Sequence, residues 1–244
     1  MTNSRKLVLF DLDGTLVDPA GAITGGVSSA LLAHGLDVPT AERLREMVGP
    51  SLAVSLASIA QVPPALVGPV MATYRAGYLE HGMAQSRPYP GVAECVEDLR
   101  ALGYRVAVAT QKPEWLAEEL LGVQGLLPLF HSVHGSPRDE TTTLPDGKAS
   151  IVAAALRRHV GGYDEAVMVG DRRHDVEGAA ANGLNCIGVT WGFAAPGELE
   201  AAQAVAVVTD ADELGEALAT VWSRPVEASA LGPGRTGSRG PAKA

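Results

Sequence analysis

The chain has 244 residues, 46% of them hydrophobic and 19% charged, which is ordinary for a globular protein with one large domain or a core with an insert. A net charge of −9 argues against general nucleic-acid binding, and no apolar run approaches the roughly 20 residues of a membrane span. The apolar run near the start is broken at Asp11, unlike a signal peptide, so we expect a cytoplasmic protein. The two cysteines, Cys95 and Cys186, lack metal-site spacing and are expected to be packed thiols.

The first predicted element is a short buried strand over residues 7–10, because a parallel strand covered on both faces reads as a continuous apolar run. Asp11 and Asp13 follow it directly, and Gly14 lets the chain turn sharply. Ligands bind at the carboxyl edge of an open α/β sheet, so these carboxylates are expected in a site. One can serve as a nucleophile and the other as an acid and base, with Mg²⁺ between them and an anionic substrate. The alternative is a strand end capped by aspartates in an Asx turn.

Residues 19–87 favour helices and show no strand pattern. The predicted helices begin with the apolar repeat from Ile23 to Leu31 and continue over 41–48, over 52–60 and from Pro63 to Tyr78. We expect a small helical domain inserted just after the first strand.

Strands and helices alternate from residue 88 onward. The predicted strands cover 104–110, 130–133, 166–169, 185–189 and 204–208, with a helix before or after each. This alternation predicts a parallel sheet with right-handed crossovers, a doubly wound α/β core made of residues 1–18 and 88–222. Residues 223–244, rich in Gly, Pro, Ser and Ala, are predicted to form a disordered tail.

Other strand ends carry polar residues too. Thr110 could hold a phosphate oxygen or cap the next helix, and Asp171 could complete a metal site or cap a helix together with Asp175. Lys148, at a predicted helix start, could bridge a carboxylate and a phosphoryl group or simply face solvent.

Taken together and in order, these residues resemble the four motifs of the haloacid dehalogenase (HAD) superfamily, across residues 6–210. The matching stretches are Asp-Leu-Asp-Gly-Thr from Asp11, then Thr110, Lys148 and Gly170-Asp171 with Asp175. The resemblance implies that Asp11 is the nucleophile, that Asp13 is the acid and base, and that Thr110 and Lys148 bind phosphate. It also implies Mg²⁺ held by Asp11, the backbone carbonyl of Asp13 and Asp171, with Asp175 in or beside the coordination shell.

The helical segment resembles the cap of the phosphoglycolate phosphatase-like branch. Within it, Tyr89-Pro90-Gly91, the run from Thr110 to Pro113 and the run from Gly170 to Asp175 look closest to bacterial phosphoglycolate phosphatases or 5′-nucleotidases. Gln111 departs from the commoner Ser or Asn. Superfamily dehalogenases lack a carboxylate at the position of Asp13, which therefore points to phosphoryl transfer.

The candidate substrate-binding residues come from the motif loops and from the cap. They are Gly14, Thr15, Ser51, Arg75, Gln111 and Arg172. Arg43, Arg45 and Tyr78 are further candidate cap contacts, and Lys112 could add positive charge near the phosphate.

We therefore expect a Mg²⁺-dependent phosphatase acting on a small phosphorylated metabolite through an aspartyl-phosphate. Neither a nucleic-acid polymer nor a membrane is an expected partner, and the protein is expected to be a monomer or a homodimer. The alternatives are a sugar phosphomutase of the same branch and a catalytically silent binding protein on the same scaffold.

Overall fold

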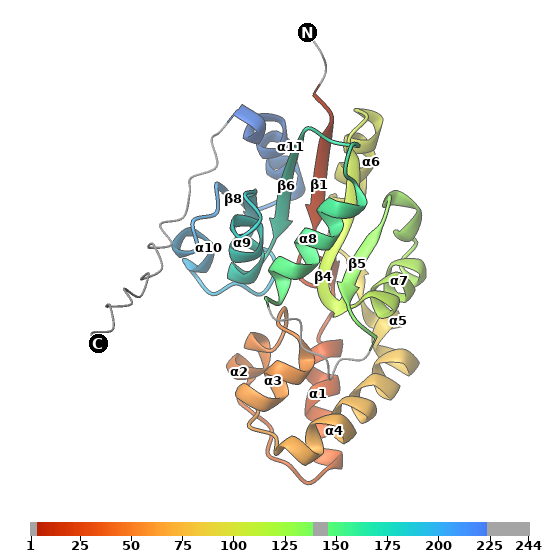
Figure 1. Ribbon diagram of the computed structural model, residues 1–244. Helices are drawn as coiled ribbons and strands as arrows, with labels where there is room; N and C mark the ends of the chain where they lie inside the picture. The colour runs from red at the N-terminus through yellow and green to blue at the C-terminus, as the bar shows by residue number, and fades with distance from the viewer. Residues whose placement is uncertain (1–3, 139–145, 224–244) are drawn as a thin grey trace, which may run out of the picture.

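A six-stranded parallel sheet forms the centre of the computed structural model, which describes residues 4–138 and 146–223 (Figure 1). Its strand order is β5-β4-β1-β6-β7-β8. The strands are β1 (Lys6–Phe10), β4 (Arg105–Pro113), β5 (Val133–Ser136), β6 (Glu165–Gly170), β7 (Asn185–Val189) and β8 (Ala206–Val208). The chain adds strands first on one side of β1 and then on the other, so β1 lies at the switch point where ligands bind in such sheets.

Helices cover both faces of the sheet, as the doubly wound prediction required. Alternate residues of each strand enter two separate apolar clusters: Val8 and Phe10 face one, Leu7 and Leu9 the other. The first cluster includes α6 (Val92–Ala101), α7 (Glu114–Val123) and α11 (Ala211–Thr220). The second includes α8 (Lys148–Arg158), α9 (Arg173–Ala180) and α10 (Glu198–Ala201). Burial on both faces explains why β1 reads as an unbroken apolar run.

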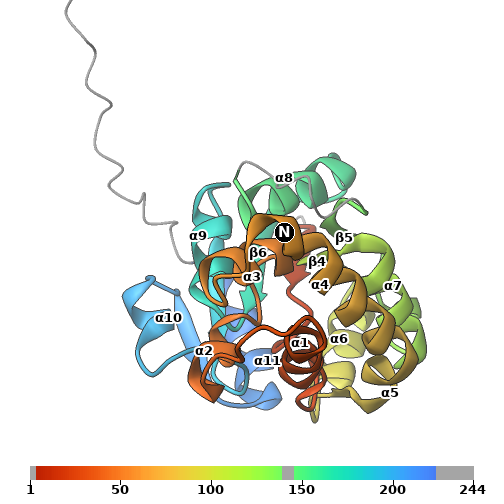
Figure 2. The ribbon, with the colours of Figure 1, turned by 90° about the horizontal axis from the view of Figure 1, so that it is seen from below.

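A helical cap lies at the carboxyl edge of the sheet, below it in Figure 1 and nearest the viewer in Figure 2. It contains α1 (Ala22–Ala33), α2 (Ala41–Glu46), α3 (Leu52–Ser58), α4 (Pro64–Gly77), the π-helical turn η1 (Tyr78–Gly82) and α5 (Met83–Gln85). The chain enters and leaves through an antiparallel ribbon of β2 (Val17–Asp18) and β3 (Arg87–Pro88). The expectation of no strand within 19–87 was wrong at Arg87, because a two-residue strand is too short to show alternation.

The other differences from the predicted elements lie at their ends. The strand predicted at 130–133 is β5, beginning at Val133, because the 3₁₀ turn η2 (Leu127–Leu129) occupies the preceding residues. β4 continues past Thr110 to Pro113, since its register against β5 shifts between Ala109 and Pro113. The last described turn, η3 (Val221–Ser223), includes the first residue of the tail predicted over 223–244, and the rest of that tail, 224–244, lies outside the described residues. In the described ranges, no helix combines the length and the apolar character needed to cross a bilayer.

Gly135 of β5 permits the close approach of the segment that carries Lys112. A Cβ at this position would lie within 3.0 Å of backbone atoms of Lys112 and Glu114. We expect Gly135→Ala to lower the free energy of unfolding by about 1–3 kcal/mol, since backbone atoms must shift to admit the methyl group. Urea denaturation would measure the change.

Gly122→Ala is the matched control for this substitution. Gly122 lies in α7, and an added Cβ would meet nothing within 4 Å. Its free energy of unfolding should stay the same or rise by up to about 1 kcal/mol, because alanine favours helix more than glycine does. Equal stability of Gly135→Ala and the wild type would contradict the packing argument.

Candidate active site

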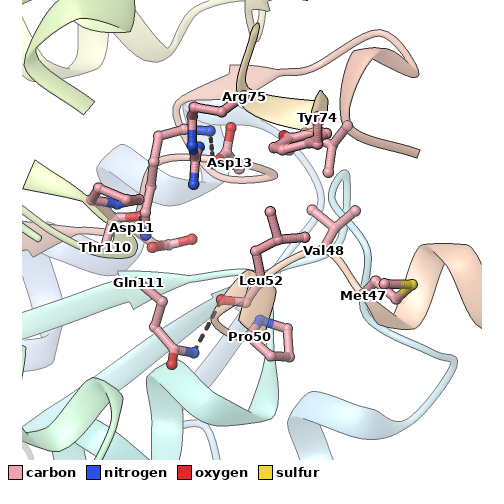
Figure 3. A pocket seen from close by; sticks show the side chains of 14 residues that line it. Asp11, Asp13, Met47, Val48, Pro50, Leu52, Tyr74, Arg75, Thr110 and Gln111 are labelled. Atoms are coloured by element: carbon pink, nitrogen blue, oxygen red, sulfur yellow. Dashed lines mark hydrogen bonds and ion pairs between the residues drawn. The ribbon is translucent and has the colours of Figure 1, made fainter. Parts of the chain in front are cut away.

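The candidate site is a pocket between the carboxyl edge of the sheet and the cap (Figure 3). Core and cap contribute different chemistry to its walls. The core residues are Asp11, Asp13, Thr110, Gln111, Lys112 and Pro113. The cap residues are Ile23, Met47, Val48, Gly49, Pro50, Leu52, Tyr74 and Arg75. The cap side is therefore mainly apolar, and the core side is charged and polar.

A buried lysine joins two of the predicted aspartates. Lys148 Nζ lies 2.6 Å from Asp11 Oδ1 and 2.6 Å from Asp175 Oδ1. Burial lowers the pKa of Lys148, but the charges of Asp11 and Asp175 outweigh this effect, and the net pKa is raised. Lys148 is thus held as a cation beside Asp11. Its place at the first residue of α8, against Gly178 of α9, directs the side chain inward.

Asp11, Asp171 and Asp175 form a buried cluster whose potential ligand oxygens all lie within 4.8 Å of one another. Asp171 Oδ2 accepts a hydrogen bond from the backbone N–H of Phe193 at 2.8 Å. Burial, followed by the charges of Asp175 and Asp11, raises the pKa of Asp171 well above its usual range. Oxygen ligands this crowded fit a hard divalent cation, which would relieve their mutual repulsion.

Asp13 forms an ion pair with a second buried lysine, Lys112. Lys112 Nζ lies 2.8 Å from Asp13 Oδ2 and donates a hydrogen bond to the hydroxyl of Tyr78, at 3.2 Å. Burial raises the pKa of Asp13, while Lys112 opposes the rise and Asp11 adds to it. The other oxygen, Oδ1, is buried and makes no hydrogen bond within the described residues. Asp11 and Asp13 therefore face the same pocket with different partners.

Two of the predicted substrate-binding residues, Arg75 and Gln111, lie at the walls of the pocket, and so does Thr110. The Thr110 hydroxyl accepts a hydrogen bond from the backbone N–H of Lys112, at 3.2 Å. Gln111 reaches across to the cap and donates to the carbonyl of Gly49 at 3.0 Å, the dashed line beside Pro50 in Figure 3. Arg75 enters from the cap, with its guanidinium carbon 5.4 Å from the centre of the Tyr74 ring. Gly49 and Tyr74 also line the pocket, although no sequence motif predicted them as site residues.

The remaining candidates lie behind or beside the pocket. Gly14 packs against Asp171, where a Cβ would collide with the carboxylate, and Thr15 Oγ1 donates to Asp171 Oδ1 at 3.4 Å. Ser51, half-buried at the start of α3, is not among the residues that line the pocket. Arg172 is not a lining residue either, as its side chain binds Glu198 Oε1 at 2.9 Å and the carbonyl of Val48 at 2.6 Å.

The other candidate cap arginines also lie outside the lining set. Arg43 donates to the carbonyl of Ile59 within the cap at 3.3 Å, whereas Arg45 reaches the core, with Nη2 3.5 Å from the carbonyl oxygen of Gly192. Gly192 and Phe193 were not predicted as site residues. The available signal was their place just after the strand β7, at the same sheet edge as the aspartates.

The fold and the site define an α/β enzyme whose pocket lies between a parallel sheet and a helical cap. Residues 8–189 match the model of the haloacid dehalogenase-like hydrolases, and the chain belongs to this family. The predicted family and fold are thereby confirmed.

Relatives named as phosphatases agree with this placement. The chain is 34% identical to a 5′-nucleotidase of Pseudomonas aeruginosa, covering 86% of this chain and 94% of the relative. It is 30% identical to a phosphoglycolate phosphatase of Agrobacterium fabrum, covering 77% and 81%. A crystal structure of a predicted phosphatase from Clostridium acetobutylicum matches with a TM-score of 0.80 and 31% identity, covering 89% of this chain and 99% of that one. The predicted enzyme class, a phosphatase of the HAD-like family, is confirmed.

One relative has a different name. The tyrosine-protein kinase PtkA of Mycobacterium tuberculosis is 35% identical, covering 88% of this chain and 73% of the relative.

Because the three carboxylates fit a hard divalent cation, we expect Mg²⁺ to stabilise the folded protein. Binding at 100 times the dissociation constant adds about 2.7 kcal/mol to the free energy of unfolding. We expect Asp171→Asn to abolish the rise in Tm that Mg²⁺ produces. In EDTA the variant should be at least as stable as the wild type, because it lacks one of the crowded charges. Thermal unfolding with and without Mg²⁺ measures both effects.

Asp164→Asn serves as the matched control, since Asp164 pairs with Arg5 at the surface and lies outside the cluster. It should keep the full Mg²⁺-induced rise. An equal rise in Asp171→Asn would show that this cluster does not bind the cation.

Proposed function

We propose that the protein is a Mg²⁺-dependent phosphatase that hydrolyses a small phosphate monoester through an aspartyl-phosphate on Asp11. The observation that carries the proposal is the placement of Asp11 and Asp13 in one pocket, each paired with its own buried lysine. This arrangement supplies a nucleophile and a separate proton-transfer group within reach of the same bound phosphate.

The reaction would proceed in two steps. In the first, Asp11 attacks phosphorus, the bond from phosphorus to the ester oxygen breaks, and the leaving oxygen takes a proton from Asp13. In the second, water attacks the aspartyl-phosphate, Asp13 takes a proton from this water, and the bond between phosphorus and Asp11 breaks to release inorganic phosphate. Thr110 and Lys148 would bind the phosphate oxygens, the lysine offsetting the negative charge between phosphate and Asp11.

Mg²⁺ would be held by the carboxylates of Asp11 and Asp171 and the backbone carbonyl of Asp13, with Asp175 in or beside its coordination shell. When bound, it neutralises negative charge on the phosphate and the carboxylates around it. The crowding of the three carboxylates supports this assignment.

The walls of the pocket favour a small metabolite. Tyr74 and the apolar cap residues offer contact to a carbon-rich leaving group, and Arg75 offers one cation for an anionic substituent. The names of the relatives suggest phosphoglycolate and nucleoside 5′-monophosphates as the first esters to test. We propose no nucleic-acid polymer as substrate, because the cap covers the pocket. A cytoplasmic location and a monomeric or dimeric state stay predictions from the sequence.

The alternatives predict different products. A sugar phosphomutase would return the phosphoryl group to a sugar and release no phosphate, and a silent binding protein would transfer none. Because one relative is named a tyrosine-protein kinase, transfer of labelled phosphate from ATP to tyrosine peptides should also be assayed.

We expect Mg²⁺-dependent release of phosphate from at least one ester in a panel of phosphoglycolate, nucleoside 5′-monophosphates and sugar phosphates. Asp11→Asn should lower kcat by at least about 10³-fold, because the amide cannot form the aspartyl-phosphate. Rapid acid quench should trap labelled protein in the wild type but not in Asp11→Asn. Phosphate release and acid-stable label are the two measurements.

Asp164→Asn again provides the control and should retain wild-type rates. Release of phosphate by Asp11→Asn at the wild-type rate would exclude Asp11 as the nucleophile. Absence of release from every ester would overturn the phosphatase proposal and favour the mutase or binding alternatives.

A further inference from the structure

We propose that Lys112 is a positioning residue for Asp13 and that Tyr78 of the cap holds Lys112 in place. Lys112 binds Oδ2 of Asp13 and leaves Oδ1 as the oxygen that exchanges a proton with the leaving group. The inference rests on the proposed phosphatase function and adds two residues, one from the core and one from the cap, to the machinery around Asp13.

The pairing of Lys112 with Asp13 is buried. The side chains are 6% and 11% exposed, and Nζ lies 2.8 Å from Oδ2, the dashed contact at Asp13 in Figure 3. Lys112 reaches Asp13 because β4 is irregular between Ala109 and Pro113 and continues toward the cap. A buried ion pair of this kind is costly to break, since either partner alone would be an uncompensated buried charge.

Tyr78 links this ion pair to the cap. Its hydroxyl accepts a hydrogen bond from Lys112 at 3.2 Å, and Nζ also lies 4.5 Å from the centre of the Tyr78 ring. Tyr78 is 1% exposed, stacks on Tyr74 at 5.7 Å between ring centres, and packs against Gly82, where a Cβ would collide with the ring. Tyr78 is thus held by packing within the cap, and its hydrogen bond to Lys112 depends on the position of the cap.

The ion pair with Lys112 leaves the second oxygen of Asp13, Oδ1, available for the substrate. Oδ1 is buried and has no hydrogen-bond partner within the described residues, although an unpaired buried acceptor is unfavourable by about 1–3 kcal/mol. It belongs to a residue that lines the pocket together with Asp11. An oxygen of the substrate can supply the missing partner.

Direct phosphate binding is the competing role for Lys112, which also lines the pocket. Two kinds of ester separate the roles. Departure of an alkoxide requires a proton from Asp13, whereas the nitrophenolate of p-nitrophenyl phosphate leaves with little help from an acid. Hydrolysis of the aspartyl-phosphate uses Asp13 for both esters, but kcat/KM reports only the first step, in which the ester oxygen leaves. A residue that acts through Asp13 therefore lowers kcat/KM selectively for alkyl esters, and a phosphate-binding residue lowers it for both esters alike.

The experiment compares kcat/KM of Lys112→Met on the preferred alkyl ester and on p-nitrophenyl phosphate. We expect a loss of about 10- to 100-fold on the alkyl ester, within the range that general acid catalysis contributes, and less than about 3-fold on the aryl ester. The inhibition constant of inorganic phosphate should be unchanged. In an Asp13→Asn background, Lys112→Met should cause no further loss of kcat/KM on the alkyl ester, because both substitutions remove the same function, proton transfer by Asp13.

Tyr78→Phe keeps the ring and removes only the hydroxyl, so it should show the same selectivity for alkyl esters with a smaller loss, about 2- to 10-fold. Lys6→Met is the matched control. Lys6 pairs with Glu165 at the amino end of β1, away from the pocket, and its removal should leave both kcat/KM values at wild-type levels.

Three results would overturn the inference. Equal losses on both esters with a raised inhibition constant for phosphate would assign Lys112 to phosphate binding. Wild-type rates in Lys112→Met would leave the lysine with no role. Both results leave the phosphatase function standing, provided that the wild type releases phosphate and Asp11→Asn does not. A wild type inactive on both esters would overturn the phosphatase proposal and this inference together.

Discussion

The convergence of buried carboxylates at the carboxyl edge of the sheet is the constraint on which the rest of the site depends. Burial raises the pKa of Asp13, Asp171 and Asp175, so each is disfavoured as an anion by its own surroundings. Lys112, near the end of β4, opposes the rise in the pKa of Asp13, and Lys148, at the start of α8, opposes it in Asp175. Lys112 contacts Asp13, Lys148 is shared by Asp11 and Asp175, and Asp171 contacts neither lysine, so a cation fits at the cluster of Asp11, Asp171 and Asp175.

The rigidity of the sheet allows such an arrangement to persist. β1 is paired on both sides, with Phe10 beside Val108 of β4 and Val169 of β6, so the residues after these strands emerge at fixed separations. Apolar clusters on both faces leave residues 7–10 of β1 with no exposed surface. Well-packed strands are a firmer support for charged groups than loops, because their backbone positions are determined by ladder hydrogen bonds and by packing.

Cap and core are joined by side chains that donate to backbone carbonyls. Arg172 binds the carbonyl of Val48, Gln111 that of Gly49, and Arg45 reaches back to Gly192. Val48 and Gly49 line the pocket, so these bonds position one of its walls. Gln111, which departs from the commoner Ser or Asn, makes this contact through its side-chain amide.

The sequence by itself determined the sheet, its order of elements and the aspartates at the strand ends. Continuous apolar runs and helical repeats are local signals, and Asp11, Asp13, Thr110 and Asp171 follow directly from where the runs stop. The short ribbon of β2 and β3 was not predicted, because a strand of two residues is too short to show an alternation of apolar and polar residues. The end of β4 was not predicted either, because the register shift depends on pairing with β5.

Only the tertiary structure decided which lysine forms an ion pair with which aspartate, and which arginine lines the pocket. Lys112 and Tyr78 are 34 residues apart and Lys148 and Asp11 are 137 apart, and no local pattern links such positions. Arg172 and Arg75 are equally plausible as anion-binding residues in the sequence, yet Arg172 is held by Glu198 and the Val48 carbonyl while Arg75 lines the pocket. Side-chain partners depend on how distant elements pack, and that packing is a property of the folded chain alone.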